Sequence, residues 1–211
     1  MFLSKLVLNP LSRAVRGDLA NFYELHRTIL QAFPDEESTK TTVLYRVDTD
    51  RRTGITTGLV QSGFAPDWGF LNERGPYLLG PPEFKDVNLS FKKGQALKFR
   101  LRANPTKRVA KRDGGTKAGY IKALFAPDEQ AAWLERKGKT GGFDVKGLTI
   151  IPEGNVVGRK DGHKITIYSV LYNGILEVTD PGEFISTVEK GIGRAKRFGF
   201  GLLSLAPFQA S

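Results

Sequence analysis

The chain has 211 residues, of which 40% are hydrophobic and 26% charged, a composition typical of a folded globular protein and not of a disordered one. It contains no cysteine, which excludes disulfide bonds, thiolate catalysis and cysteine-bound metals. The formal net charge of +10 is uneven: residues 1–90 carry 10 Lys and Arg against 11 Asp and Glu, whereas residues 91–211 carry 22 against 11. A basic half beside a neutral half favours a polyanionic partner such as nucleic acid, although a solvated basic surface would have the same composition.

The first half of the chain predicts the order strand, helix, strand, strand, helix and a weak final strand. Polar and apolar residues alternate over residues 2–8, which is typical of a half-buried strand. A helix is expected over residues 18–33, because Asp18 is a good N-cap residue and Pro34 cannot continue a helix. The other expected segments are a loop over 9–17, a strand pair over 41–49 and 55–62, a short helix over 66–73 and the weak strand over 87–91.

The second half of the chain predicts the same order. Over residues 92–103 the alternation places Lys98, Arg100 and Arg102 on one face of a strand and apolar residues on the other. Asn173-Gly174 predicts a two-residue turn within a hairpin over 163–180. The remaining expected segments are a basic loop over 104–120, helices over 127–138 and 181–191, a strand over 141–150 and a last strand over 199–207.

Two copies of this order indicate an α+β protein with two tandem ferredoxin-like units, each a βαββαβ sandwich similar to an RNA-recognition motif. We place the N-terminal domain at residues 1–88 and the C-terminal domain at residues 95–211. No segment has the roughly 18 consecutive apolar residues that a membrane helix needs. The start, MFLSKLVLNP, is typical of a strand and not of a signal peptide. We therefore expect a cytoplasmic protein that binds no membrane.

A glycine-rich loop, GIGRAKRFGFG, spans residues 191–201. It lacks the third glycine of a dinucleotide fingerprint and the spacing of a Walker loop, and it follows a helix where the dinucleotide motif follows a strand. One interpretation is a tight connection that needs positive φ angles. The other is a loop whose backbone N–H groups and cations contact phosphates. The glycines and cations are Gly191, Gly193, Gly199 and Gly201, with Arg194, Lys196 and Arg197.

Two histidines occur in the chain, His26 and His163. His26 lies at the margin of the apolar stripe of the first helix and shares a face with Tyr23, three residues earlier. A histidine there is either a structural residue or a catalytic one. His163 falls in an exposed hairpin without an evident partner. The sequence has no H-E-x-x-H pattern and no carboxylate cluster, so an enzyme acting on RNA would be metal-independent.

The segment from Phe91 to Lys117 is strongly basic, with Asp113 as its one acidic residue. Its strand places cations on one sheet face, which favours a surface that follows a nucleic-acid backbone over a solubility tail. The cations are Lys92, Lys93, Lys98, Arg100, Arg102, Lys107, Arg108, Lys111, Arg112 and Lys117.

Several stretches occur together in a familiar order: SRAVRGDLANFYELHRTI, LVQS…PDW, FRLRANPTKR, WLERKG…GF and GIGRAKRFGFGLLSLAP. Over residues 1–207 the chain resembles the CasE-type CRISPR-associated endoribonucleases. The resemblance implies two ferredoxin-like domains and a single cut at the 3′ base of each CRISPR repeat hairpin. It also implies that the protein stays bound to its product as a subunit of Cascade. Phe22 departs from the proline that is common in the family at that position.

The resemblance assigns His26 as the catalytic histidine, acting as general acid or base, and Tyr23 as its helper. The implied reaction is attack of a ribose 2′-OH on the neighbouring phosphate, with no metal and no small-molecule cofactor. The partners are a CRISPR repeat RNA hairpin and other Cascade subunits. The alternatives are a non-catalytic RNA-binding scaffold and, less favoured, a nucleotide-binding enzyme. The expected RNA-binding residues are Arg13, Arg27, Lys98, Arg100, Arg102, Lys107, Arg108, Arg159, Lys160, Gly191, Gly193, Arg194, Lys196, Arg197, Gly199 and Gly201.

Overall fold

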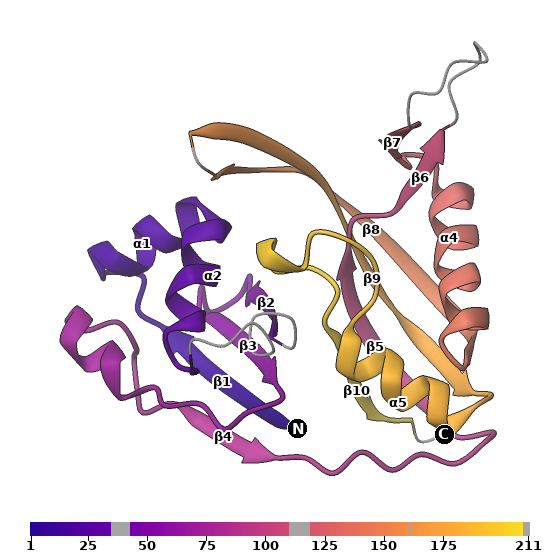
Figure 1. The fold of residues 1–211 in the computed structure, drawn as a ribbon, viewed down its shortest axis with the longest axis horizontal. Coiled ribbons are helices and arrows are strands. Elements are labelled where there is room, and N and C mark those ends of the chain that lie inside the picture. Colours follow the sequence, from indigo (N-terminus) through magenta and orange to yellow (C-terminus); the bar gives the residue numbers. More distant parts are fainter. Residues whose placement is uncertain (35–42, 110–118, 161, 209–211) are drawn as a thin grey trace.

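Two four-stranded antiparallel sheets, each with helices packed against it, form the computed structural model of the chain, which describes residues 1–34, 43–109, 119–160 and 162–208 (Figure 1). The sheet orders are β2-β3-β1-β4 and β10-β5-β9-β8. Both orders are the ferredoxin-like one, in which the first and third strands are central. The predicted α+β class with two tandem ferredoxin-like units is therefore confirmed, and the boundaries at residues 88 and 95 stay a prediction.

The N-terminal domain packs its helices over one face of its sheet. Its core is centred on Leu6, Leu8, Leu25 and Tyr45, all nearly inaccessible to solvent. The elements are β1 (Phe2–Leu8), α1 (Arg13–Ala20), α2 (Phe22–Leu30), β2 (Leu44–Thr49), β3 (Thr56–Ser62), the 3-10 helix η1 (Gly69–Arg74) and β4 (Glu83–Asp86).

The structure corrects the expected single helix over residues 18–33. Ser12 caps α1, and Asn21 in an extended conformation separates α1 from α2. Asp18 is not a cap: its buried carboxylate accepts hydrogen bonds from the hydroxyls of Thr28 and Tyr77, each at 2.7 Å. A buried carboxylate needs such donors, so Asp18 is held inside the fold and not at the start of a helix.

The last strand of this domain is also displaced from its expected place. β4 occupies Glu83–Asp86 and not residues 87–91, and it pairs with the start of β1. All of its side chains are exposed. An exposed edge strand shows no alternation of polar and apolar residues, so periodicity could not locate it.

The C-terminal domain carries the second core, centred on Leu101, Leu134, Tyr172, Leu176 and Phe184. Its elements are β5 (Ala96–Ala103), α4 (Pro127–Thr140), β8 (Phe143–Lys160), β9 (His163–Val178), α5 (Pro181–Lys190), the 3-10 helix η2 (Lys196–Phe198) and β10 (Leu203–Pro207). A separate pair, β6 (Thr106–Val109) and β7 (Tyr120–Ala123), flanks residues 110–118, which lie outside the described part of the chain.

The predicted turn at Asn173-Gly174 is wrong. β9 runs unbroken through both residues, and Gly174 pairs with Phe99 on one side and Leu148 on the other. A Cβ atom on Gly174 would lie 2.0 Å from the carbonyl oxygen of Gly147. The glycine therefore serves the close approach of two strands and not a change of direction.

A two-stranded arm extends from the second sheet. The pairing of β9 with β5 ends at Val170 and Ala103, but β8 and β9 remain paired as far as Lys160 and His163. We call residues 154–160 and 163–169 the β8–β9 arm. Figure 1 shows this arm reaching from the C-terminal domain toward the helices α1 and α2. Among the described residues, none of the helices is long and apolar enough to cross a membrane.

Candidate active site

Helix α2 places His26 at the boundary between the helix layer and the first core. The side chain is only 3% exposed, so His26 is more buried than its marginal place in the apolar stripe predicted. The imidazole lies nearly parallel to the Tyr45 ring, with centroids 6.1 Å apart and an interplanar angle of 14°. The position of His26 is thus set by packing against an aromatic residue of β2.

Burial makes the His26 imidazole neutral near pH 7. Desolvation, followed by the positive charge of Arg197, lowers the pKa of His26 from 6.5 to about 4. Nδ1 is buried and has no hydrogen-bond partner within the part of the chain that the structure describes. A neutral ring can accept a proton from a substrate hydroxyl without first losing one.

The glycine loop owes its shape to positive φ angles and to tight packing. Gly191, Gly193, Gly199 and Gly201 all have positive φ, as has Ala195. A Cβ atom on Gly199 would lie 3.1 Å from the Tyr45 ring, and one on Gly191 would lie 2.8 Å from the carbonyl oxygen of Gly201. The conformational interpretation of these glycines therefore holds, and it explains how η2 comes to lie against α2.

The cations of this loop have different surroundings. Arg194 and Arg197 are exposed, and Arg197 is close enough to His26 to lower its pKa. The Lys196 ammonium donates a hydrogen bond to the carbonyl oxygen of Lys190 at the end of α5. Lys196 therefore stabilises a helix C-terminus, and the two arginines are the cations available to a phosphate.

Tyr45 joins helix α2 to the glycine loop. Its hydroxyl oxygen lies 2.5 Å from the carbonyl oxygen of Phe22 and 3.3 Å from that of Arg197. Tyr23 packs against Phe198 of η2, with ring centroids 5.9 Å apart. Sequence reasoning missed Tyr45, because a tyrosine in a buried strand gives no signal of a contact with a loop about 150 residues away.

Asn21 is a second residue that the sequence analysis missed. It is the N-cap of α2, and its side chain contacts the backbone of Arg159 in the β8–β9 arm. A signal was present, because Asn followed by Glu three residues later is typical of a helix start. The structure thus brings together α2, the glycine loop and the arm, with Tyr23, His26, Arg159 and Arg197 among their residues.

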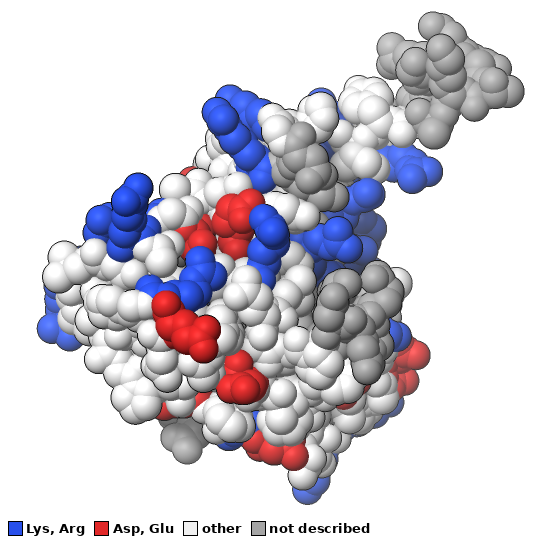
Figure 2. All heavy atoms as spheres, turned by 60° about the vertical axis from the view of Figure 1, so that its left-hand side comes forward, with Lys and Arg blue, Asp and Glu red and all other residues white. Residues whose placement is uncertain are grey.

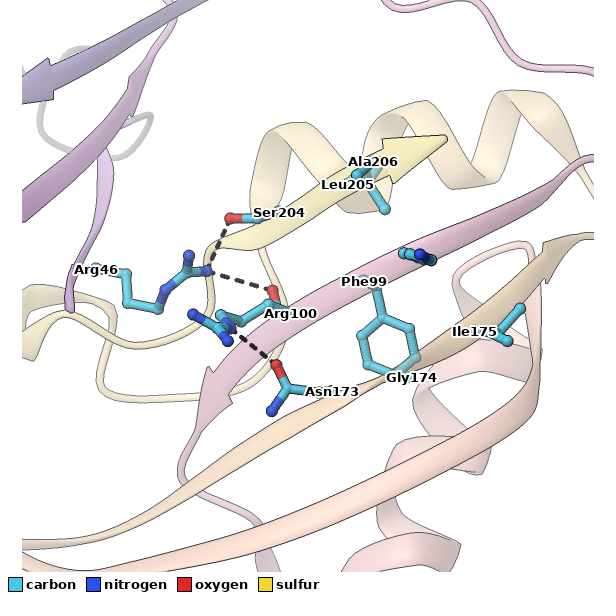
Figure 3. A pocket seen from close by; sticks show the side chains of 10 residues that line it. Arg46, Phe99, Arg100, Asn173, Gly174, Ile175, Ser204, Leu205 and Ala206 are labelled. Carbon is cyan, nitrogen blue, oxygen red and sulfur yellow. Dashed lines mark hydrogen bonds between the residues drawn. The ribbon is translucent and has the colours of Figure 1, made fainter. Parts of the chain in front are cut away.

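Lys98 and Arg100 lie elsewhere, on the open face of the second sheet, as the alternation predicted. They line a hollow of about 490 Å³. Figure 3 shows Arg46 entering it from β2, where its guanidinium donates to the carbonyl oxygen of Arg100 at 3.3 Å and to the Ser204 hydroxyl at 2.8 Å. Because Arg46 belongs to β2 and contacts β5 and β10, it links the two domains at this point. Its side chain is buried there, with only 5% of the residue exposed.

Arg102 is already engaged in ion pairs. Its guanidinium donates to both carboxylate oxygens of Glu153, at 2.7 and 2.8 Å, and lies 3.6 Å from Asp48. Its positive charge is therefore balanced inside the protein. This arrangement separates Arg102 from the exposed cations with which the alternation grouped it.

The other predicted cations are spread over the surface. Arg13, Arg27 and Arg108 are exposed, as is Arg159 on the arm. Arg27 pairs with Glu24 at 3.1 Å and Lys107 with Glu129 at 2.6 Å, and both pairs are solvent-accessible. Lys160 ends β8, and its side chain lies outside the described atoms. Figure 2 shows Lys and Arg side chains gathering in the upper part of one face, with acidic side chains among and below them.

The chain matches a known family over almost its whole length. The model of the family described as CRISPR associated protein covers residues 1–207. The chain belongs to this family. Among the described residues of this CRISPR-associated protein, no group of three or more His, Asp or Glu side chains could hold a metal ion.

Relatives of this CRISPR-associated protein match it over almost the whole chain, in sequence and in fold. The CRISPR-associated endoribonuclease Cse3 of Thermus thermophilus is 41% identical, over 98% of this chain and 100% of that protein. The Cascade subunit CasE of Escherichia coli is 32% identical, over 98% and 100%. A structure of Thermus thermophilus Cse3 bound to an RNA representing a pre-cleavage complex has a TM-score of 0.84 at 39% identity, with 98% of each chain covered. The predicted resemblance to the CasE-type proteins is confirmed.

Proposed function

We propose that this CRISPR-associated protein is an endoribonuclease that cuts the repeat hairpins of precursor CRISPR RNA and then remains a subunit of Cascade. The observation that carries the proposal is the buried, neutral His26, which lies between Tyr45 and Arg197 of the glycine loop. The relatives named as an endoribonuclease and as a Cascade subunit support it. The RNA-bound pre-cleavage structure of a relative supports RNA as the substrate.

RNA brings its own nucleophile to this site. A ribose 2′-OH attacks the adjacent phosphorus, so the O2′–P bond forms and the P–O5′ bond breaks. The products are a 2′,3′-cyclic phosphate and a 5′-OH end. Because the nucleophile belongs to the substrate, the protein has to hold the reacting atoms in line, move protons and stabilise charge.

His26 is neutral at pH 7 and can therefore take the general-base role. A neutral imidazole removes the proton of the 2′-OH as the oxygen attacks. A phosphate bound beside it adds negative charge, which favours the imidazolium and strengthens proton uptake in the complex. We assign Tyr23 as the helper that orients the phosphate or donates a proton to the leaving oxygen, and Arg194 and Arg197 as the cations that stabilise the phosphorane.

The RNA is gripped away from the reacting phosphate by exposed cations. Arg159 on the β8–β9 arm is held beside the start of α2, through the contact of its backbone with Asn21. Each phosphate neutralised in this way should change the slope of log K against log salt concentration by about −0.7 to −0.9. Lys98 and Arg100 remain proposed contacts on a separate face.

The test is cleavage of a hairpin repeat RNA in excess EDTA by the wild type, His26→Ala and the matched control His163→Ala. Binding is measured in parallel with an RNA that carries a 2′-deoxy group at the cut site. We expect one cut by the wild type and by His163→Ala, and loss of cutting with retained binding for His26→Ala. Binding without cutting by all three proteins would establish a non-catalytic scaffold instead.

A further inference from the structure

Asn21 lies where three parts of the molecule meet. Its extended backbone ends α1, and its side-chain Oδ1 accepts a hydrogen bond from the backbone N–H of Tyr23 at 3.3 Å, which caps α2. An N-cap needs only an acceptor, and Ser, Thr or Asp would supply one equally well. The cap therefore does not explain why an amide is present.

The same amide pairs with one residue of the β8–β9 arm. Nδ2 donates to the carbonyl oxygen of Arg159 at 3.0 Å, and Oδ1 accepts from the backbone N–H of Arg159 at 3.1 Å. A side chain must offer a donor and an acceptor side by side to make this pair, which Asn does and Ser, Thr and Asp do not. Turning the amide over would place donor against donor, so the pairing itself fixes its orientation.

The contact is backed by close apolar packing. A Cβ atom on Gly158, the residue before Arg159, would lie 2.8 Å from the Phe198 ring and 3.3 Å from Asn21 Oδ1. Phe198 also packs against Tyr23 and belongs to a small apolar cluster with Ile167 of the arm. The arm is thus seated on the N-terminus of the catalytic helix and on the glycine loop at once.

We propose that Asn21 is a positioning residue that sets the distance between the RNA stem held by the β8–β9 arm and the phosphate presented to His26. The inference rests on the proposed function. Successive phosphates of one strand are only a few ångströms apart along the axis of a duplex. A small displacement of the arm relative to α2 therefore brings a neighbouring bond to His26, and a misplacement of about 1 Å can slow a reaction roughly 100-fold. Asn21 consequently selects which phosphodiester bond is cut.

The experiment separates the cap from the arm contact. Asn21→Asp keeps an acceptor for Tyr23 and for Arg159 N–H but loses the donor to the Arg159 carbonyl oxygen, which its carboxylate then repels. Asn21→Ser keeps a cap and is too short to reach the arm. Ser12→Ala is the matched control, because it removes the cap of the neighbouring helix α1 without touching the arm.

Three quantities are measured for each variant on an end-labelled hairpin repeat RNA: the cut positions, the single-turnover rate and the Kd for the 2′-deoxy RNA. For Asn21→Asp and Asn21→Ser we expect additional cuts at adjacent bonds and a rate lowered about 10- to 100-fold. We expect their Kd to stay within about threefold and their Tm close to that of Ser12→Ala.

Asn21→Asp or Asn21→Ser cutting at the single wild-type position and at the wild-type rate would overturn the inference and leave Asn21 as a cap. A loss of rate matched by an equal loss in Ser12→Ala would also overturn it, because helix stability would then explain the effect. Failure of the wild type itself to cut would overturn the proposed function, which is a different result.

Discussion

The His26 ring is removed from water and packs against Tyr45. This burial, followed by the positive charge of Arg197, lowers the pKa of His26 to about 4. Because this pKa lies below the value of about 6.5 in the unfolded chain, the unfolded chain binds a proton first as the pH falls. The contribution to stability is therefore complete above about pH 6.5 and is lost toward pH 4. A difference of about 2.5 pKa units corresponds to about 3 kcal/mol.

Replacing His26 by Phe should remove this part of the pH dependence, because Phe keeps an aromatic ring against Tyr45 and binds no proton. Urea unfolding of wild type and His26→Phe at pH 7 and pH 4.5 measures it. We expect the free energy of unfolding of the wild type to fall by about 2 kcal/mol more than that of the variant between these pH values.

The pKa itself is accessible by NMR, since only two histidines give ring signals and His163→Ala assigns them. Arg197→Gln should raise the pKa of His26, because a nearby positive charge disfavours the imidazolium. A wild-type pKa near 6.5, unchanged in Arg197→Gln, would contradict both the burial and the proximity argued for this pair.

Single elements show where local sequence signals succeed and where packing overrides them. β5 was predicted from the alternation of polar and apolar residues, which acts between near neighbours along the chain. The start of the helix over residues 18–33 was misplaced because Asp18 is of a residue type that caps helices, whereas its carboxylate accepts hydrogen bonds from Thr28 and Tyr77. The predicted turn at Asn173-Gly174 was wrong because Gly174 is required by the close approach of Gly147, on the neighbouring strand β8.

The contact of Gly174 with Gly147 yields a matched pair of substitutions. Gly174→Ala places a methyl group 2.0 Å from the Gly147 carbonyl oxygen, whereas a Cβ on Gly147 itself would be no nearer than 3.9 Å to Ile175. We expect Gly174→Ala to lower the free energy of unfolding by about 2–3 kcal/mol and Gly147→Ala to change it by less than about 1 kcal/mol. Urea unfolding of both variants checks this, and equal effects would speak against the strand geometry.

Over the whole molecule, polar contacts hold the two domains together in one arrangement. Arg46 of β2 pairs with Asp48 and reaches the carbonyl oxygen of Arg100, and Arg102 of β5 contacts Asp48 and Glu153. The Gln61 side chain of β3 donates to the carbonyl oxygen of Val188 in α5. With Asn21 and Tyr45, these contacts place helix α2 against the glycine loop and the arm.

The docking of the two domains is the part of the structure that could not be predicted from the sequence. Two repeats of one element order predicted two ferredoxin-like units, because each unit is built from near neighbours in the chain. His26, Tyr23 and the basic loop were also named from the sequence, and their functional roles stay predictions. The approach of Arg197 to His26 spans 171 positions and depends on how the domains dock, which periodicity and spacing do not encode.

The salt dependence of RNA binding tests whether Arg102 contacts an RNA phosphate or stays paired with Glu153 and Asp48. Arg159 is exposed and can neutralise a phosphate, so Arg159→Gln should lower the slope of log K against log salt by about one. Arg102 is neutralised by Glu153 and Asp48, so Arg102→Gln should leave the slope unchanged. It should instead lower the free energy of unfolding by about 1–3 kcal/mol, because it leaves two half-buried carboxylates without their partner.

Fluorescence-detected binding of the 2′-deoxy hairpin at several salt concentrations measures the slope, and urea unfolding measures the stability. A slope reduced by Arg102→Gln as much as by Arg159→Gln would mean that Arg102 leaves Glu153 when RNA binds. The domain contact would then be a part of the molecule that RNA rearranges. An unchanged slope with lowered stability assigns Arg102 to the contact between the domains, where the geometry places it.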